Sequence, residues 1–303
     1  MKKVLFVLLL FFPLVTLAQS YPIGEFYFDL DRTNKTATIV NRSGKSYEGD
    51  IVIPETVEYG GVKYTVTTIG KNCFHAASGL FSVVIPNTIT KIEEYAFSNA
   101  TSLTTLRIPN TVKTIGKQAF EWCNSLRELD LGTGVTSLGG SCITDCHSLA
   151  YLKIPNNVVR MGSQAISSCY GLKTLVIGSG LTEIGSNGFI LLTHIKDVYC
   201  LGKNIPYNGA NIWAFSSTDE ATLHVPESSI ETYINSPYWG GKFKNIVALT
   251  AEEEQTLGVK DAVLSRDNVP VGRYNLNGTK ATDSQHGIII EKMKDGTTRK
   301  VIK

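Results

Sequence analysis

FSVVIPNTITKIEEYAFSNATSL, residues 81–103, and TTLRIPNTVKTIGKQAFEWCNSL, residues 104–126, are two copies of one 23-residue pattern. Residues 127–149, 150–172 and 173–195 continue the pattern without a gap. Self-similarity at a fixed period of about 20 to 50 residues is typical of solenoids and related repeat architectures. The sequence therefore predicts a stack of similar coils, and this prediction decides every later one.

Apolar residues recur at fixed positions of each unit. The third and fifth positions are apolar in all five units, and residues two apart share one face of a strand. Three further apolar positions follow in each unit, so we expect all five to line the inside of one coil. The third and fifth positions hold Val83, Leu106, Leu129, Leu152 and Leu175, and Ile85, Ile108, Leu131, Ile154 and Ile177.

Turn residues separate these apolar positions. Pro86, Pro109 and Pro155 are each followed by Asn, and glycine-rich pairs replace them in the other units, which ends the strand. Glycine recurs at a second fixed place, and we interpret it as a corner whose backbone angle only glycine adopts cheaply. These residues are Gly116, Gly139, Gly162 and Gly185.

One coil cannot bury its own apolar face. Stacking coils about 4.7 to 4.9 Å apart would complete both a parallel strand ladder and the core. Each buried Leu or Ile would contribute roughly 1.5 to 3 kcal/mol. We therefore expect a repeat solenoid, capped at both ends, with a small β tail.

The flanks read as atypical copies, as expected for the ends of a solenoid. Residues 51–80 carry the pattern with extra residues, and Tyr59-Gly60-Gly61-Val62 predicts a small hairpin there. Residues 25–40 begin with the alternation of an antiparallel starting strand. Residues 222–226 (TLHVP) repeat the strand-and-proline element. Aromatic residues after it are expected to cover the last coil, namely Tyr233, Tyr238, Trp239 and Phe243.

The first 18 residues predict a secretory signal peptide, with a basic start, an apolar run and small residues before a cleavage point after Ala18. The apolar run is shorter than the ~20 residues of a membrane helix. We therefore expect an exported chain, extracellular or on the outer cell surface, with no membrane span. A net charge of +2 without a basic cluster argues against a nucleic-acid partner.

The predicted organisation has four parts. The acidic run at residues 251–255 is interpreted as a polar joint between solenoid and tail, and strand-like runs follow it. The parts are a signal peptide at 1–18, an N-terminal cap at 19–50, a solenoid with its C-terminal cap at 51–249, and a linker with a small β domain at 250–303.

The units resemble the BspA-type leucine-rich repeats of secreted proteins from Gram-negative oral and gut bacteria. Ile108-Pro109-Asn110, Ile115-Gly116 and Ala119-Phe120 stand in phase, with Cys123 three residues before Leu126. The resemblance runs from about residue 25 to residue 249. It implies a leucine-rich-repeat right-handed coil, surface display and adhesion, with host matrix and plasma proteins as partners of some members. It implies no catalytic residues and no cofactor.

Two parts of the chain qualify this resemblance. The third regular unit departs from the pattern, because Cys142-Ile143 replaces Ala-Phe and Leu131-Gly132 replaces Ile-Pro, yet apolar or turn character is kept. The tail resembles a C-terminal sorting domain used for export across an outer membrane. That resemblance rests on YNLNG at residues 274–278, GIII at 287–290 and the terminal KVIK.

Six cysteines in an exported chain permit disulfides. Cys123, Cys146 and Cys169 nevertheless share one repeat position with Ala100 and Leu192, which predicts a buried ladder of small apolar side chains. A disulfide between stacked neighbours stays open as an alternative, because a coil spacing near 4.8 Å lies within the usual Cα separation of about 4.4 to 6.8 Å.

Catalytic and metal-binding signals are weak. Cys142-x-x-x-Cys146-His147 lacks the second ligand pair of a zinc site. No Ser, Asp and His stand in a nucleophile-elbow arrangement. We expect no catalytic residues, no metal and no cofactor, and hence not an enzyme.

The open side of the strand ladder is the candidate binding face. If the third and fifth positions point inward, the second and fourth point outward. Tyr and Arg among them are enriched at recognition surfaces, although an ordinary solvated sheet face is the competing interpretation. The twelve positions are Ser82, Val84, Thr105, Arg107, Glu128, Asp130, Tyr151, Lys153, Thr174, Val176, Asp197 and Tyr199.

The leading hypothesis is an adhesin-like secreted or cell-surface protein that binds macromolecules through this face. Its partner would be a host or neighbouring-cell surface or matrix protein, or a glycan. The alternative is a glycan-binding accessory protein of a nutrient-uptake system, for which Tyr151 and Tyr199 would be the aromatic platforms on this face. An enzyme is the least favoured hypothesis.

Overall fold

The structure is a computed structural model that describes residues 20–42, 46–206, 215–253 and 256–257, together with the backbone of three strands between residues 270 and 302. The predicted signal peptide lies outside the described residues. Among the described helices, none is long and apolar enough to cross a membrane.

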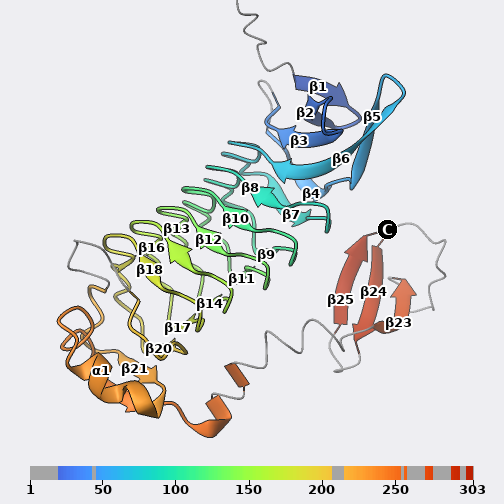
Figure 1. Ribbon diagram of the computed structural model, residues 1–303. Helices are drawn as coiled ribbons and strands as arrows, with labels where there is room; N and C mark the ends of the chain where they lie inside the picture. The colour runs from blue at the N-terminus through green and yellow to red at the C-terminus, as the bar shows by residue number, and fades with distance from the viewer. Residues whose placement is uncertain are drawn as a thin grey trace, which may run out of the picture.

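The repeats form a parallel β-solenoid, as predicted (Figure 1). Thr105 pairs with Glu128 and Tyr151 with Thr174, so within the regular units each step of the ladder advances the chain by 23 residues. Successive coils contribute one strand each to this ladder. Its strands form three hydrogen-bonded groups that follow one another along the stack: β4 (Gly49–Val52) with β7 (Leu80–Val84), β9 (Thr105–Arg107) with β11 (Glu128–Asp130), and β14 (Tyr151–Ile154) with β17 (Thr174–Ile177), β20 (Asp197–Cys200), β21 (Thr222–Val225) and β22 (Asn245–Ala248).

Two further ladders close the coil into a three-sided section. Most of their strands carry a single buried apolar residue. Such a strand shows no period-two alternation, so these strands could not be predicted from the sequence. The second ladder holds β8 (Lys91–Ile92), β10 (Thr114–Ile115), β12 (Ser137–Leu138), β15 (Arg160–Met161) and β18 (Glu183–Ile184), and the third holds β13 (Ile143–Thr144), β16 (Ile166–Ser167) and β19 (Phe189–Ile190).

The interpretation of the recurrent glycines as corners with a special backbone angle was wrong. None of the four has a positive φ. A Cβ on Gly139 would instead lie 2.4 Å from the backbone nitrogen of Lys117 in the preceding coil, so close coil contact requires glycine there. Left-handed φ angles recur at two other positions of the unit, Tyr95, Gln118, Ser141, Gln164 and Asn187, and Asn99, Trp122, Asp145, Ser168 and Leu191.

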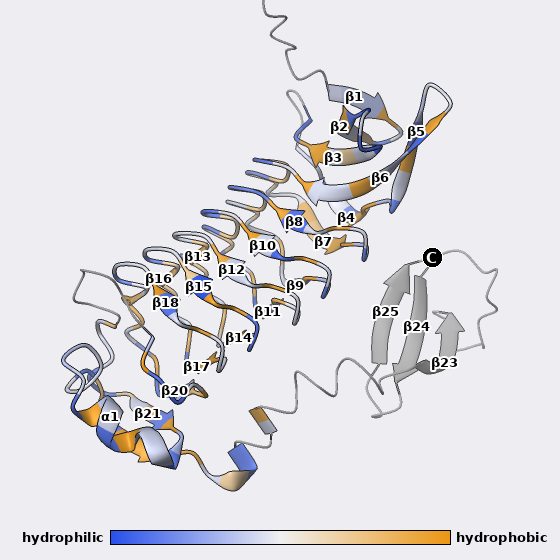
Figure 2. Cartoon of the chain, viewed as in Figure 1, coloured by the Kyte–Doolittle hydropathy of each residue, from blue (hydrophilic) through white to orange (hydrophobic). Residues whose placement is uncertain are grey.

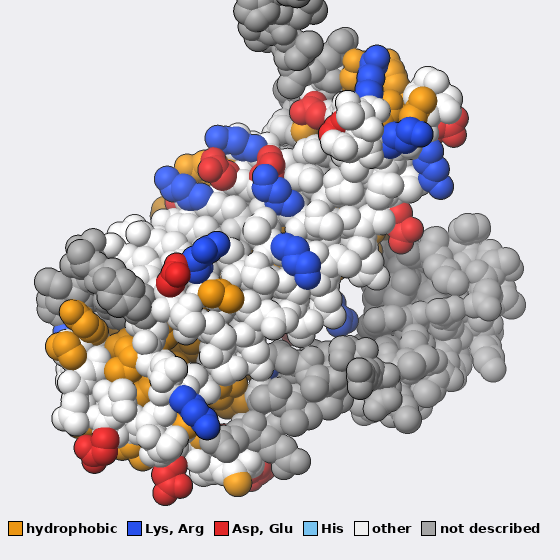
Figure 3. All heavy atoms as spheres, in the orientation of Figure 1, with side chains coloured by type: hydrophobic (Ala, Val, Ile, Leu, Met, Phe, Trp, Pro, Cys, Tyr) orange, Lys and Arg blue, Asp and Glu red, His pale blue; other side chains and the backbone are white. Residues whose placement is uncertain are grey.

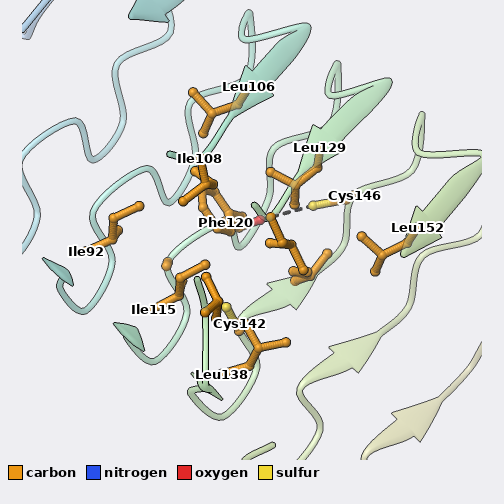
Figure 4. Packing of buried hydrophobic residues seen from close by; sticks show 14 of the residues in the cluster. Ile92, Leu106, Ile108, Ile115, Phe120, Leu129, Leu138, Cys142, Cys146 and Leu152 are labelled. Atoms are coloured by element: carbon orange, nitrogen blue, oxygen red, sulfur yellow. Dashed lines mark hydrogen bonds between the residues drawn. The ribbon is translucent and has the colours of Figure 1, made fainter. Parts of the chain in front are cut away.

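The predicted inward positions form one continuous core. Leu106, Leu129 and Leu152 are buried side by side in successive coils (Figure 4). Phe97 and Phe120 stack with ring centroids 5.6 Å apart in neighbouring coils. Apolar and polar segments alternate around each coil (Figure 2). Burial of these aligned positions is the main stabilising contribution to the stack.

The N-terminal cap begins as an antiparallel sheet of β1 (Ser20–Ile23), β2 (Phe26–Asp31) and β3 (Thr36–Val40). The predicted hairpin is confirmed as β5 (Thr56–Tyr59) and β6 (Val62–Ile69), joined by two glycines with φ of 60° and 75°. Because β3 pairs with β6 and β6 with β8, the cap is continuous with the second ladder.

The C-terminal cap contains η1 (Glu227–Ser229) and α1 (Ile230–Ile234). Tyr233, Trp239 and Phe243 are buried as predicted, but Tyr238 is 38% exposed and does not cover the coil. The tail contains an antiparallel sheet of β23 (Pro270–Asn275), β24 (Ile288–Met293) and β25 (Thr298–Ile302).

Candidate binding surface

The outer strand face is the outward side of the ladder from β7 to β22. It consists of the second and fourth positions of each unit. Most of the predicted binding positions lie there with exposed or half-buried side chains. The exposed ones are Val84, Thr105, Arg107, Glu128, Asp130 and Tyr151, and the half-buried ones are Ser82, Lys153, Thr174, Asp197 and Tyr199.

Val176 is the exception to the predicted exposure. It occupies the outward register, between Lys153 and Tyr199, but its side chain is fully buried and does not belong to the core cluster. Something therefore covers the outer strand face at this coil.

A hollow of about 280 Å³ lies on the outer strand face. Its lining includes Arg107, Asp130, Tyr151, Lys153 and Pro155, so it spans β9 to β14. The Arg107 Nε lies 3.3 Å from Asp130 Oδ2. Because both side chains are about half exposed, this ion pair stabilises the fold by no more than about 1 kcal/mol. The two groups can therefore rearrange towards a partner at little cost.

A second depression of about 710 Å³ lies on the N-terminal side of the hollow. Val84, Asn87, Thr105, Arg107 and Glu128 are among its lining residues. Both depressions share Arg107, so together they form one continuous surface from β7 to β14. An open surface of mixed charged, aromatic and aliphatic side chains suits contact with a macromolecule, whereas small-molecule sites are usually enclosed clefts.

The C-terminal part of the outer strand face is arranged differently. Tyr199 stacks on His224 with ring centroids 4.3 Å apart, and His224 Nε2 lies 3.2 Å from Asp197 Oδ1. Tyr199 is therefore not an open aromatic platform, contrary to the prediction. His224 follows Tyr199 in the same register. The phase of TLHVP in the sequence could have placed it on this face.

A helical segment returns across these strands after the last coil. We call residues 250–253 and 256–257 the strap; residues 251–253 and 256–257 are helical. Thr250 and Glu253 bond to each other in both directions, from Thr250 N to Glu253 Oε2 at 2.8 Å and from Glu253 N to Thr250 Oγ1 at 3.2 Å. This reciprocal arrangement is a capping box. The described part of the predicted polar joint, residues 251–253, is therefore helical.

The strap contacts the outer strand face at two points. Glu253 Oε1 lies 3.7 Å from His224 Nδ1, and Lys153 Nζ donates to the carbonyl oxygen of Leu257 at 2.6 Å. Burial raises the pKa of Glu253, but the bonds from Thr250, the charge of His224 and the Tyr199 hydroxyl lower it by more, so its pKa lies below the ordinary value.

Three aromatic residues outside the strand face escaped the sequence prediction. Trp122 and Tyr170 are 46% and 42% exposed, and His147 lies between them. Ring centroids are 6.3 Å apart for Trp122 and His147 and 5.0 Å apart for His147 and Tyr170. The other residues at the position of Trp122 are mostly small or polar, so the repeat pattern gave no signal for this row.

The cysteine ladder is confirmed as a set of buried free thiols. Cys123, Cys146 and Cys169 each direct Sγ at a backbone carbonyl of the preceding coil. Burial raises the pKa of Cys123 and of Cys142 to about 12, which suppresses thiolate chemistry. Among the described residues, no three His, Cys, Asp or Glu side chains are grouped to hold a metal ion.

The outside of the second ladder carries paired opposite charges. Lys91 Nζ lies 2.8 Å from Glu93 Oε1, and Arg160 Nε lies 4.0 Å from Glu183 Oε2. Figure 3 shows Lys and Arg side chains beside Asp and Glu along these coils. This side has the character of an ordinary solvated face.

Fold and surface together define a leucine-rich-repeat β-solenoid, a class that typically serves as a non-catalytic binding scaffold. Residues 67–196 match the family of BspA type leucine rich repeat regions, in six copies. No curated protein matches the sequence.

Several solved structures are similar to the chain. A leucine rich cell surface protein from Faecalibacterium prausnitzii is 20% identical over 79% of this chain and 97% of its own, with a TM-score of 0.39. A leucine rich repeat protein from T. pallidum is 18% identical over 79% and 95%, with a TM-score of 0.45. One from Bacteroides ovatus is 17% identical over 76% of each chain, with a TM-score of 0.32.

Proposed function

We propose that the chain is an adhesin-like surface protein that binds a macromolecular partner through the outer strand face between β7 and β14. The observation that carries this proposal is the continuous pair of depressions that share Arg107. Tyr151 and Val84 are each 42% exposed at its two ends, and charged groups lie between them. Aromatic and Arg side chains of this kind dominate binding energy at protein interfaces.

Export is part of the proposal. The apolar start of the sequence supports a signal peptide removed after Ala18, and the strands of the tail support a sorting-like domain that directs the chain to the outer surface. A protein on a cell surface meets other surface or matrix proteins first, so these form the proposed partner class. The Gram-negative origin implied by the resemblance belongs to the same proposal.

Glycan binding in a nutrient-uptake system is the second candidate. The row of Trp122, His147 and Tyr170 favours it, because exposed aromatic rings next to polar groups provide stacking surfaces for sugars. This row lies outside the outer strand face, so the two candidates predict different surfaces.

Binding of the purified chain to purified matrix and plasma proteins, in parallel with a glycan array, tests both candidates. Saturable binding to a protein supports the first proposal. Binding to glycans alone supports the second, and a Trp122→Ala, Tyr170→Ala variant should then lose it. Absence of saturable binding on both panels would contradict both candidates.

A further inference from the structure

Three valines share the fourth position of the repeat unit and so form an internal comparison. Val84 in β7 and Val247 in β22 are 42% and 37% exposed, whereas Val176 in β17 is fully buried. The residue type is the same in all three; Val176 and Val247 stand in one register, and Val84 is at the exposed end of its own strand's alternation. The burial of Val176 therefore comes from something lying on the face.

The strap accounts for this burial. In the register of the ladder, Val176 lies between Lys153 on one side and Tyr199 on the other. Lys153 donates a hydrogen bond to the carbonyl of Leu257, and the carboxylate of Glu253 lies beside His224, whose ring stacks on Tyr199. The described residues Glu253 and Leu257 of the strap therefore lie against the strands on the two sides of Val176.

The docking contacts have a recognisable chemistry. His224 lies beside one carboxylate of the strap, and the Lys153 ammonium donates a hydrogen bond to a backbone carbonyl of the strap. Asp197 Oδ1 lies 3.2 Å from His224 Nε2 at the same place. Between these two polar contacts, Val176 provides an apolar surface.

We propose that the outer strand face from β14 to β21 is a docking site for a short acidic helical segment, and that the chain fills this site with its own strap. The strap then masks this part of the face, and a partner that needs the whole face must displace it. This inference rests on the proposed function for its biological meaning, but its structural content does not depend on any partner.

Cysteine accessibility in the full chain tests the proposal without a ligand. All six native cysteines are buried, so a single introduced cysteine reports its own exposure. Val176→Cys is compared with Val84→Cys and Val247→Cys, which occupy the same repeat position on the uncovered parts of the face. The measured quantity is the rate of reaction with a small thiol reagent.

The proposal predicts that Val176→Cys reacts at least tenfold more slowly than both references. Adding Glu253→Gln should raise the rate at position 176 at least tenfold and leave the rate at position 84 unchanged. Glu252→Gln is the matched control, since it removes the same charge from an exposed neighbour in the strap. The proposal is overturned if position 176 reacts as fast as the references, or if the Glu253 and Glu252 variants behave alike.

This test separates the two proposals. A masked position 176 that opens in the Glu253 variant supports the docking site even where no partner binds to the panels. A position 176 that is open from the start removes the docking site and leaves the surface from β7 to β14 untouched.

Discussion

Cys146 Sγ lies 3.0 Å from the carbonyl oxygen of Phe120 in the preceding coil (Figure 4). Cys123 makes the same contact with Phe97 at 3.1 Å, so a thiol at this position links each coil to the previous one. The cysteine side chain is small and apolar, and its thiol is also a hydrogen-bond donor. Cysteine therefore recurs at this position, and the apolar residues alanine and leucine also fit it.

Cys146→Ala should therefore lower the free energy of unfolding by about 1 to 2 kcal/mol, because it removes both the sulfur volume and the donor. Chemical denaturation followed by circular dichroism measures this. Ser148→Ala, an exposed change two residues away, should stay within about 0.5 kcal/mol. Equal midpoints for the two variants would show that the ladder contributes nothing to stability.

The native thiols should resist modification. Burial raises the pKa of Cys73, Cys123, Cys142 and Cys200, to about 12 for Cys123 and for Cys142, so thiolate is scarce near pH 8. A colorimetric thiol reagent should find no rapidly reacting thiol in the folded chain and six after denaturation. A fast-reacting thiol in the folded chain would contradict the buried ladder.

Gly139→Ala should destabilise the stack, because the added Cβ would lie 2.4 Å from a backbone atom of the neighbouring coil. We expect the free energy of unfolding to fall by about 1 to 3 kcal/mol, which is typical of overpacking. Gly202→Ala is the control, since its Cβ would meet its nearest atom at 3.5 Å. Denaturation midpoints that do not differ between these variants would refute the role of close coil contact.

Acid should release the strap. The pKa of Glu253 lies below its ordinary value of about 4.3, so its docking contribution is present above that value and is lost as the pH falls through the lowered pKa. His224, Asp197, Tyr199 and Lys153 are the other titratable groups at the contact.

The rate at Val176→Cys, divided by that at Val84→Cys, measures this release with a pyridyl disulfide, which reacts in acid. The ratio should rise as the pH falls from about 5 to about 3 and should be high throughout in the Glu253→Gln background. Circular dichroism over the same range separates strap release from unfolding. A ratio independent of pH would exclude Glu253 as the titrating group.

The regular part of the fold could be predicted because apolar positions such as Leu106 and Leu129 repeat at one spacing and meet in register. The second and third ladders could not, since a strand such as Thr114–Ile115 is too short to show alternation. The corners were misassigned because a recurrent glycine has two possible causes, a left-handed angle or a close neighbour, and composition does not separate them.

The candidate site, too, could be predicted from the sequence only in part. Local alternation correctly placed Arg107 and Tyr151 on the outer strand face. The burial of Val176 depends on a contact between Lys153 and Leu257, which are 104 residues apart, and no periodic pattern encodes it. Residues that do not recur from unit to unit, such as Glu253 in the strap and the exposed Trp122, could therefore be placed only with the structure.

The most direct test of the binding surface compares two matched triple variants for affinity to whichever partner the panels identify. The first removes Arg107, Asp130 and Tyr151, each changed to Ala, from the outer strand face. The second removes Arg160, Glu183 and Tyr238 in the same way. It also deletes one ion pair between neighbouring coils, here in the second ladder, and one exposed tyrosine, here in the C-terminal cap.

Surface plasmon resonance with folded variants of equal stability gives the two dissociation constants. We predict that the outer-face variant binds at least tenfold more weakly than the unaltered chain, about 1.4 kcal/mol, and that the second variant binds as the unaltered chain does. Unchanged affinity of the outer-face variant, or an equal loss in both, would contradict the assignment of the partner surface to β7–β14.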